Sequence, residues 1–187
     1  MFKVASFDIS TNAGVCLGTV NGQDVKIDYL QTWTEKKQER PIDRAREFAE
    51  RTLYFLDHNK PDLIIIEGYA TGARNMSTAI IECSAMIKFA LSVRGYDWIE
   101  IPPTTLKTFV ANNGTVKKDV IIKQVYKLWD VDTDDDNQAD AVSLMYMGAS
   151  LLGVDCVPEA HLRAWNKIKD HADYIRVLGN LAKKQGC

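Results

Sequence analysis

The sequence lacks the features that mark membrane-spanning, secreted and zinc-binding proteins. No stretch approaches the roughly 20 consecutive apolar residues that cross a bilayer. The segment Met1-Phe2-Lys3-Val4 enters an expected strand at once, so we expect no signal peptide. The cysteines are scattered without a C-x-x-C pair, which argues against a zinc site and is typical of free thiols in a reducing cytosol. They are Cys16, Cys83, Cys156 and Cys187. We therefore expect a cytoplasmic protein with no membrane partner.

Strong net charge is also missing, but the charges are unevenly placed. The chain carries −2 over 187 residues, of which 46% are hydrophobic, enough for one core with a small appendage. Thr104 to Trp129 holds five lysines and one acid, whereas Asp130 to Asp140 holds six aspartates and no base. Such neighbours suit a site that holds phosphates and a metal together. Taken alone, the charges favour the simpler interpretation of a solvated helix face followed by an Asp-rich loop.

Hydrophobic periodicity and turn signals predict an α/β chain. Three meandering strands come first, with an Asn-Gly hairpin signal between the second and third, and helices and strands alternate after them. The expected strands are Phe2–Asp8, Gly14–Val20, Val25–Thr32, Leu63–Glu67 and Trp98–Ile101. The expected helices are Pro41–His58, Ser77–Arg94, Thr104–Ala111, Val116–Trp129, Gln138–Leu152, Val157–His171 and Ala172–Lys184.

Three acids follow or interrupt apolar segments. Asp8 ends one apolar run, Glu67 ends another, and Asp140 lies beyond the first turn of an apolar helix. If the first and fourth strands are parallel neighbours, Asp8 and Glu67 lie side by side at their carboxyl ends, where α/β sheets place their sites. Gathered carboxylates repel unless a cation lies between them, and Mg²⁺ prefers oxygen ligands. The acids therefore predict metal-dependent phosphodiester hydrolysis, although Asp8 alone also fits a turn.

Five short motifs resemble those of one nuclease family, in its order and at about its spacing. They are Phe7-Asp8-Ile9-Ser10 with Gly14, Ile64-Ile65-Ile66-Glu67, Pro102-Pro103-Thr104-Thr105-Leu106-Lys107, Asn113-Gly114-Thr115-Val116-Lys117-Lys118 and Asp136-Asn137-Gln138-Ala139-Asp140-Ala141. Residues 2 to about 152 thus resemble the RuvC-type Holliday junction resolvases. The resemblance implies a ribonuclease-H-like mixed five-stranded sheet flanked by helices in residues 1–152. Residues 153–187 are expected to form a short helical C-terminal extension, for which packing on the core is the default interpretation.

The same resemblance implies a metal site and its chemistry. Asp8, Glu67 and Asp140 match the family's metal-binding carboxylates, and two Mg²⁺ ions, replaceable by Mn²⁺, are expected between them. The family's fourth ligand, an Asp or His, falls at Asn137 here, which is a departure. Asp136 lies four residues before Asp140 and shares its helix face, so we predict Asp136 as fourth ligand. Asn137 is a weaker donor, and Asp135 serves if the helix starts later.

DNA contacts are implied by the family's lysines and by an aromatic residue. Lys107 and Lys118 match lysines that approach the scissile phosphate, and Lys117 adjoins them. Without the resemblance they are ordinary surface lysines. Tyr69, in the loop after Glu67 that also holds Arg74, is placed by region to stack on an unpaired base. A core tyrosine packed beneath the loop is an equally good interpretation.

The resemblance implies a Mg-dependent endodeoxyribonuclease that binds branched DNA, above all four-way junctions, as a homodimer. Hydrolysis is expected to leave a 5′ phosphate and a 3′ hydroxyl. Two alternatives remain: a ribonuclease H acting on RNA–DNA hybrids, and a junction-binding module without catalysis. The pattern Asp8-x-x-Thr11-x-x-Gly14 also loosely matches the phosphate loop of actin-like ATPases. Those enzymes need two such domains and this chain holds one, so no nucleotide cofactor is expected.

Overall fold

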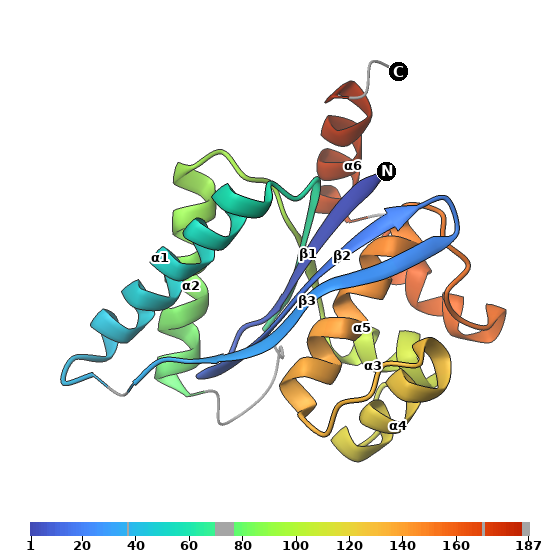
Figure 1. Ribbon diagram of the computed structural model, residues 1–187, viewed down its shortest axis with the longest axis horizontal. Coiled ribbons are helices and arrows are strands. Elements are labelled where there is room, and N and C mark those ends of the chain that lie inside the picture. Colours follow the sequence, from blue (N-terminus) through green and yellow to red (C-terminus); the bar gives the residue numbers. More distant parts are fainter. Residues whose placement is uncertain (37, 70–76, 170, 185–187) are drawn as a thin grey trace.

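A five-stranded mixed sheet forms the centre of the computed structural model, which describes residues 1–36, 38–69, 77–169 and 171–184. The strand order is β3-β2-β1-β4-β5 (Figure 1). β1 pairs antiparallel with β2 and parallel with β4, which confirms the predicted sheet. The strands are β1 Phe2–Asp8, β2 Asn12–Asn21, β3 Asp24–Thr34, β4 Leu63–Glu67 and β5 Ile99–Ile101.

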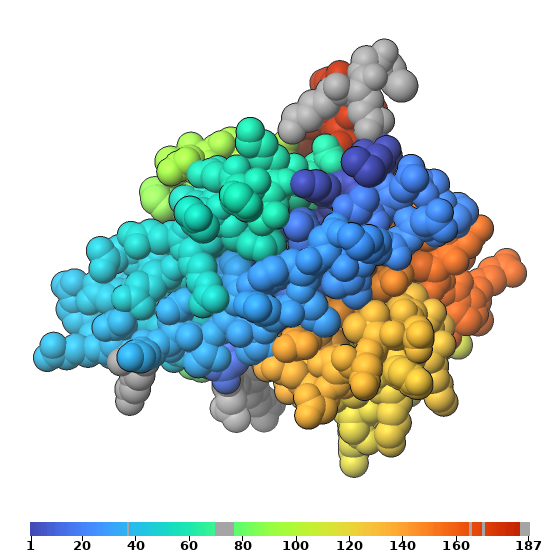
Figure 2. Space-filling model, in the orientation of Figure 1, coloured from blue at the N-terminus to red at the C-terminus, as the bar shows by residue number. Residues whose placement is uncertain are grey.

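The composition of each strand follows from its place in the sheet. Residues 4–8 of β1 and residues 63–66 of β4 are all buried, because helices cover both faces of these inner strands. The outer strand β3 instead mixes exposed and partly buried residues, with Trp33 as its one buried residue. It crosses the surface between the helices of the two faces (Figure 2). The unbroken apolar runs that preceded Asp8 and Glu67 in the sequence therefore mark the two central strands.

Helices form a layer on each face of the sheet. Helices α1 and α2 cover one face, and α3, α4 and α5 cover the other (Figure 1). Each layer encloses a separate hydrophobic core against the sheet. The helices are α1 Pro41–Asn59, α2 Thr78–Val93, α3 Pro103–Ala111, α4 Lys118–Trp129, α5 Asp136–Leu151 and α6 Ala172–Lys184, with a 3₁₀ helix η1 at Glu159–Lys167.

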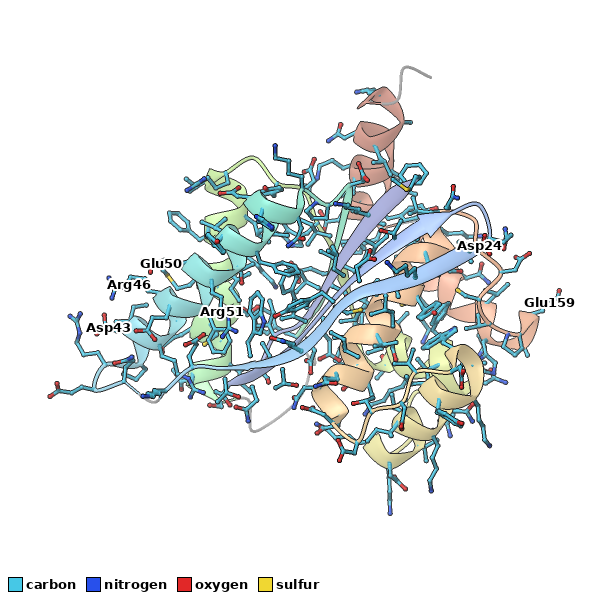
Figure 3. The ribbon with its side chains drawn as sticks, viewed as in Figure 1. Asp24, Asp43, Arg46, Glu50, Arg51 and Glu159 are labelled. Atoms are coloured by element: carbon cyan, nitrogen blue, oxygen red, sulfur yellow. The ribbon has the colours of Figure 1, made fainter. Side chains whose placement is uncertain are left out.

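Charged side chains on and beside α1 lie at the surface of the core that α1 and α2 enclose against the sheet. Asp43, Arg46 and Glu50 lie along the outer side of this helix (Figure 3). The guanidinium of Arg51 lies 4.5 Å from the ring centroid of Trp33 and also pairs with Glu35 at 2.8 Å. Because a guanidinium stacks well on an aromatic face, the ring stays covered while the charge remains at the surface.

Helix α5 is the buried helix of the fold. From Ala139 to Leu151, every residue except Asp140 is buried. At Gly148 the helix lies against the sheet so closely that a Cβ atom there would be 2.7 Å from Cγ1 of Val4 and 3.0 Å from Cγ1 of Ile65. The glycine therefore sets the distance between α5 and the central strands.

Several boundaries differ from the sequence expectations. Helix α5 begins at Asp136, two residues before the expected start, because Asp135 caps it. The expected α-helix Val157–His171 is wrong: the segment forms the shorter 3₁₀ helix η1, held onto α3 by side-chain bonds to backbone carbonyls. Four residues of the C-terminal extension join the core that α3, α4 and α5 enclose against the sheet: Val154, Ala164, Ile168 and Val177. Within the described ranges, no helix is long and apolar enough to span a membrane.

Replacing Gly148 by alanine is predicted to destabilise the protein despite the better helix propensity of alanine. The new methyl group meets buried, branched side chains, and overpacking of this kind costs about 1–3 kcal/mol. Gly179 in α6 is the matched control, because a Cβ there meets nothing within 4 Å. Gly179→Ala should raise the free energy of unfolding by up to about 1 kcal/mol. Urea denaturation measures both, and equal effects of the two substitutions would contradict the close packing of α5.

Candidate active site

A cavity of about 280 Å³ opens where β1 and β4 end, at the carboxyl ends of the parallel strands. Its position is the one at which α/β sheets place their sites. Most of the residues singled out in the sequence line it together: Asp8, Glu67, Tyr69, Lys107, Lys118, Asn137 and Asp140. They come from β1, from β4 and the loop after it, and from the helices α3, α4 and α5.

The carboxyl groups of Asp8 and Glu67 lie in hydrogen-bonding contact with each other. The register of the two parallel strands pairs Phe7 with Ile66, which makes Asp8 and Glu67 the next residues along each strand. Asp8 is only 6% exposed. Burial, followed by the charge of Glu67, raises the pKa of Asp8 well above its ordinary value. Burial also raises the pKa of Glu67.

Asp140 enters the same cavity from α5, and two contacts attach this helix to the strands beside Asp8. The buried hydroxyl of Ser6 donates to the carbonyl of Ala141 at 2.7 Å. Gly14, the partner of Asp8 in the β1–β2 register, lies against the first turn of α5. A Cβ at Gly14 would stand 1.8 Å from the carbonyl oxygen of Asn137, so only glycine fits there. These contacts hold Asp140 close enough to Asp8 to sense its charge.

The result is a carboxyl group with a strongly altered acidity. Burial, and next the charge of Asp8, raise the pKa of Asp140 from its ordinary value of 3.8 to about 7. Lys118 and Lys107 oppose this rise. The cavity therefore gathers acids that cannot all ionise without a further positive charge.

Asp135 does not line the cavity, and its role is structural. Its Oδ1 accepts hydrogen bonds from the backbone N–H groups of Asn137 at 2.8 Å and Gln138 at 3.3 Å, as an N-cap of α5 does. Its Oδ2 accepts from the hydroxyl of Thr32 on β3 at 2.5 Å. Partial burial opposes ionisation, but these hydrogen bonds lower the pKa of Asp135 below its ordinary value. Asp135 is therefore an ionised helix cap that ties α5 to the third strand.

Asp136, the predicted fourth ligand, forms an ion pair with the ammonium group of Lys118. Burial alone would lower the pKa of Lys118, but Asp136 and then Asp140 and Asp8 raise it. Asn137 lines the cavity, and its side-chain N–H donates to Asp135 at 3.1 Å. Lys117 is exposed at the N-cap of α4 and is not part of the cavity lining.

Tyr69 lies at the rim of the cavity and is partly buried. Its ring is 4.3 Å from the Nζ atom of Lys88 on α2, which in turn pairs with Glu100 at 2.7 Å. The ammonium group of Lys88 therefore makes a cation–π contact with the ring of Tyr69. Arg74, the second residue assigned to this loop, lies outside the described residues.

The donor atoms of the cavity suit a hard divalent cation. Asp8, Glu67 and Asp140 offer carboxylate oxygens and Asn137 offers an amide oxygen. Burial, followed by the other acids, raises the pKa values of Asp8 and Asp140, and burial raises that of Glu67, so a cation would favour their charged forms. Among the described residues, no three acidic, histidine or cysteine side chains already stand in an arrangement that would hold a metal ion.

Three residues that position this site were not predicted to do so from the sequence: Ser6, Gly14 and Thr32. Ser6 carried a usable signal, since a hydroxyl inside an apolar strand needs a buried acceptor. Thr32 lies 103 residues from Asp135, and nothing in either local sequence announces the contact.

The acids are predicted to make metal-free stability depend on pH. Between 3.8 and about 7 the folded state holds a proton on Asp140 that the unfolded chain has released, so stability falls as pH rises through this window. A shift of this size corresponds to at most about 4 kcal/mol. Thermal unfolding in EDTA from acidic to mildly alkaline pH should show a falling Tm, and Mg²⁺ should restore it most above neutrality.

Two substitutions separate this effect from general charge effects. Asp140→Asn should flatten the dependence and raise the Tm of the metal-free protein at alkaline pH. Asp132→Asn removes an exposed aspartate of the preceding loop and should leave the dependence as it is. A Tm that rises from acidic to alkaline pH in EDTA would overturn the assignment of Asp140.

Comparison with known proteins bears on the fold. No protein-family model and no curated protein matches the sequence. Among solved structures, RuvC from Thermus thermophilus matches with a TM-score of 0.64 and 17% identity, covering 79% of this chain and 97% of that chain. The same protein in complex with a Holliday junction substrate matches with a TM-score of 0.66 and 18% identity over 80% and 98%. The yeast mitochondrial Holliday junction resolvase Ydc2 matches with a TM-score of 0.50 and 15% identity over 92% and 82%. The chain therefore has the ribonuclease-H-like fold of the RuvC-type resolvases.

Proposed function

We propose that the protein is a metal-dependent endonuclease that cuts branched DNA, with the four-way Holliday junction as its main substrate. One observation carries the proposal: Asp8, Glu67 and Asp140 converge in a single cavity with Lys107 and Lys118 at the catalytic position of this fold. The shared fold with junction resolvases favours branched DNA over other phosphodiesters, and one of those neighbours was solved with a junction substrate.

The acids define the chemistry that the cavity is suited to. Asp8, together with Glu67 and with Asp136 or Asp140, would hold two Mg²⁺ ions, and Mn²⁺ would be able to substitute. When bound, such ions activate water, neutralise a non-bridging phosphate oxygen and stabilise the leaving oxygen. The protein's carboxylates fix that charge in a partly buried cavity, where electrostatic interactions are stronger than in bulk water. The products would be a 5′ phosphate and a 3′ hydroxyl.

Lys118 links substrate binding to the fourth acid. In the structure its ammonium group neutralises Asp136. A scissile phosphate in the cavity competes for Lys118, because phosphate oxygens are strong acceptors from ammonium groups. Asp136 would then be released toward Asp8 and Asp140 as the fourth ligand, assisted by the amide oxygen of Asn137. Lys107, on the opposite wall, would hold the same strand.

DNA contacts outside the chemistry would come from Lys117 and from the loop after Glu67. Lys117 is exposed beside Lys118 and suits a backbone phosphate. Tyr69, supported by Lys88, would stack on a base unpaired at the branch point, with Arg74 as its neighbour in the loop.

Symmetric cutting of a four-way junction calls for two active sites, and we propose that the protein acts as a homodimer. Helix α2 supplies a suitable surface. Its large apolar side chains Ile81, Phe89 and Val93 are 42%, 65% and 67% exposed. They recur at intervals of eight and four residues, which places them along one side of the helix.

Cleavage assays provide the central test. With Mg²⁺ or Mn²⁺, the protein should introduce paired, symmetric nicks in an end-labelled four-way junction, and EDTA should abolish them. Asp8→Asn should lower the rate by about a thousandfold or more, because it removes charge from the centre of the site. Asp24→Asn is the matched control, since Asp24 is exposed in the β2–β3 hairpin (Figure 3).

The other substrates decide between the candidate functions. Cutting of an RNA–DNA hybrid alone would make the protein a ribonuclease H. Junction binding without cutting in either metal would leave a binding module and would overturn the catalytic assignment of the acids.

The fourth ligand is tested by Mg²⁺ titration of the cleavage rate. Asp136→Asn removes a full negative charge and should shift half-saturation to higher Mg²⁺ more than Asn137→Ala, which removes a neutral donor. A larger shift with Asn137→Ala would transfer the role to Asn137. Circular dichroism checks that both variants remain folded.

A further inference from the structure

A polar groove lies next to the cavity that holds Asp8, Glu67 and Asp140, which we call the active cavity. The C-terminal extension forms part of this groove. It has a volume of about 590 Å³ and lies between α3, the loop that leads to α4, and η1. Thr104 and Thr108 form one wall, the Gly114-Thr115 turn closes the end, and Arg163 and Lys167 of η1 form the other wall with Asn166. None of these residues was assigned a role in the active cavity.

The groove and the active cavity share helix α3. Pro103 and Lys107 line the cavity, whereas Thr104 and Thr108 line the groove. The two sites are therefore separated by the width of one helix. A nucleic-acid strand that left the cavity past Lys107 would have to cross only α3 to reach the groove.

The extension is fixed in this position by contacts to the backbone of α3. A ring nitrogen of His161 lies 2.9 Å from the carbonyl oxygen of Phe109. The guanidinium of Arg163 donates to the carbonyl of Asn112, the C-cap residue of α3, whose backbone is in the left-handed conformation. Because backbone carbonyls are the acceptors, the wall formed by η1 has a defined place relative to the cavity.

The chemistry of the groove matches a phosphate backbone. Its lining contains two cations, three hydroxyl groups and an amide, and no carboxylate. Glu159, the acid at the start of η1, projects outward at the right edge of the molecule, away from α3 and α4 (Figure 3). Hydroxyls, amides, Arg and Lys are the groups that hold phosphate oxygens in protein–DNA complexes, without reading sequence.

We propose that this groove binds the sugar-phosphate backbone of one duplex arm of the branched DNA, beside the strand that enters the active cavity. The inference rests on the proposed function and extends it: residues 159–167 enlarge the DNA-binding surface. Lys167 provides the principal charge, because it is exposed, whereas Arg163 is also engaged with the backbone of Asn112.

The test compares charge changes at two exposed lysines of the extension. Lys167→Ala and Lys167→Glu alter the groove. Lys183→Ala and Lys183→Glu make the same changes on α6, which lies at the opposite end of the sheet from the carboxyl end of β1 (Figure 1). Binding of a fluorescent four-way junction is measured by anisotropy in EDTA, across a series of KCl concentrations. Wild-type protein is titrated in parallel.

Lys167→Ala should weaken junction binding about three- to tenfold at low salt and should reduce the slope of log K against log salt by about 0.9, the value for one lost phosphate contact. Lys167→Glu should weaken it further, and the Lys183 variants should bind like wild type. Wild-type affinity in the Lys167 variants, or equal losses in the Lys183 variants, would overturn the groove assignment alone. Failure of the wild-type protein to bind any junction would overturn the proposed function together with it.

Discussion

The contact between helix α5 and the two central strands positions the acids on which the active cavity depends. A glycine at each end makes this contact possible: Gly14 admits the first turn of the helix, and Gly148 admits its last turns. Ser6 then fastens the helix from within by its bond to Ala141. Asp140 is carried beside Asp8 by this packing, so the electrostatics of the cavity follow from the steric fit of one helix.

The repulsion between the gathered acids is relieved by a hydrogen-bonding contact and an ion pair within the cavity. The carboxyl groups of Asp8 and Glu67 are in hydrogen-bonding contact, and Lys118 pairs with Asp136. Acids forced together in a packed interior would otherwise weaken the fold, since like charges at low dielectric repel strongly. Binding a cation and keeping the fold stable therefore place opposing demands on the same side chains. These side chains meet both demands because they can bind a proton, a lysine or a metal ion.

Local sequence was sufficient for the central strands and for the acids at their ends, because burial on both faces leaves an unbroken apolar run before each acid. Asp140 was found for a related reason, since a charge inside an apolar helix stands out. The contacts that position these acids were not predictable: Thr32 bonds Asp135 across the sheet, and Gly14 faces the carbonyl of Asn137. The 3₁₀ helix at Glu159–Lys167 was also missed, because its shape depends on α3 and not on its own periodicity. The ligand set and the DNA-binding residues stay predictions.

The raised pKa values of Asp8 and Asp140 have a consequence for the binding of a metal ion in this cavity. Any cation that enters the cavity must displace protons, so its apparent affinity falls as the surroundings become more acidic. Loading and acidity are then linked in both directions, and each binding event releases acid into the buffer. A modest drop in pH would then weaken metal binding in the cavity without any change in the concentration of magnesium.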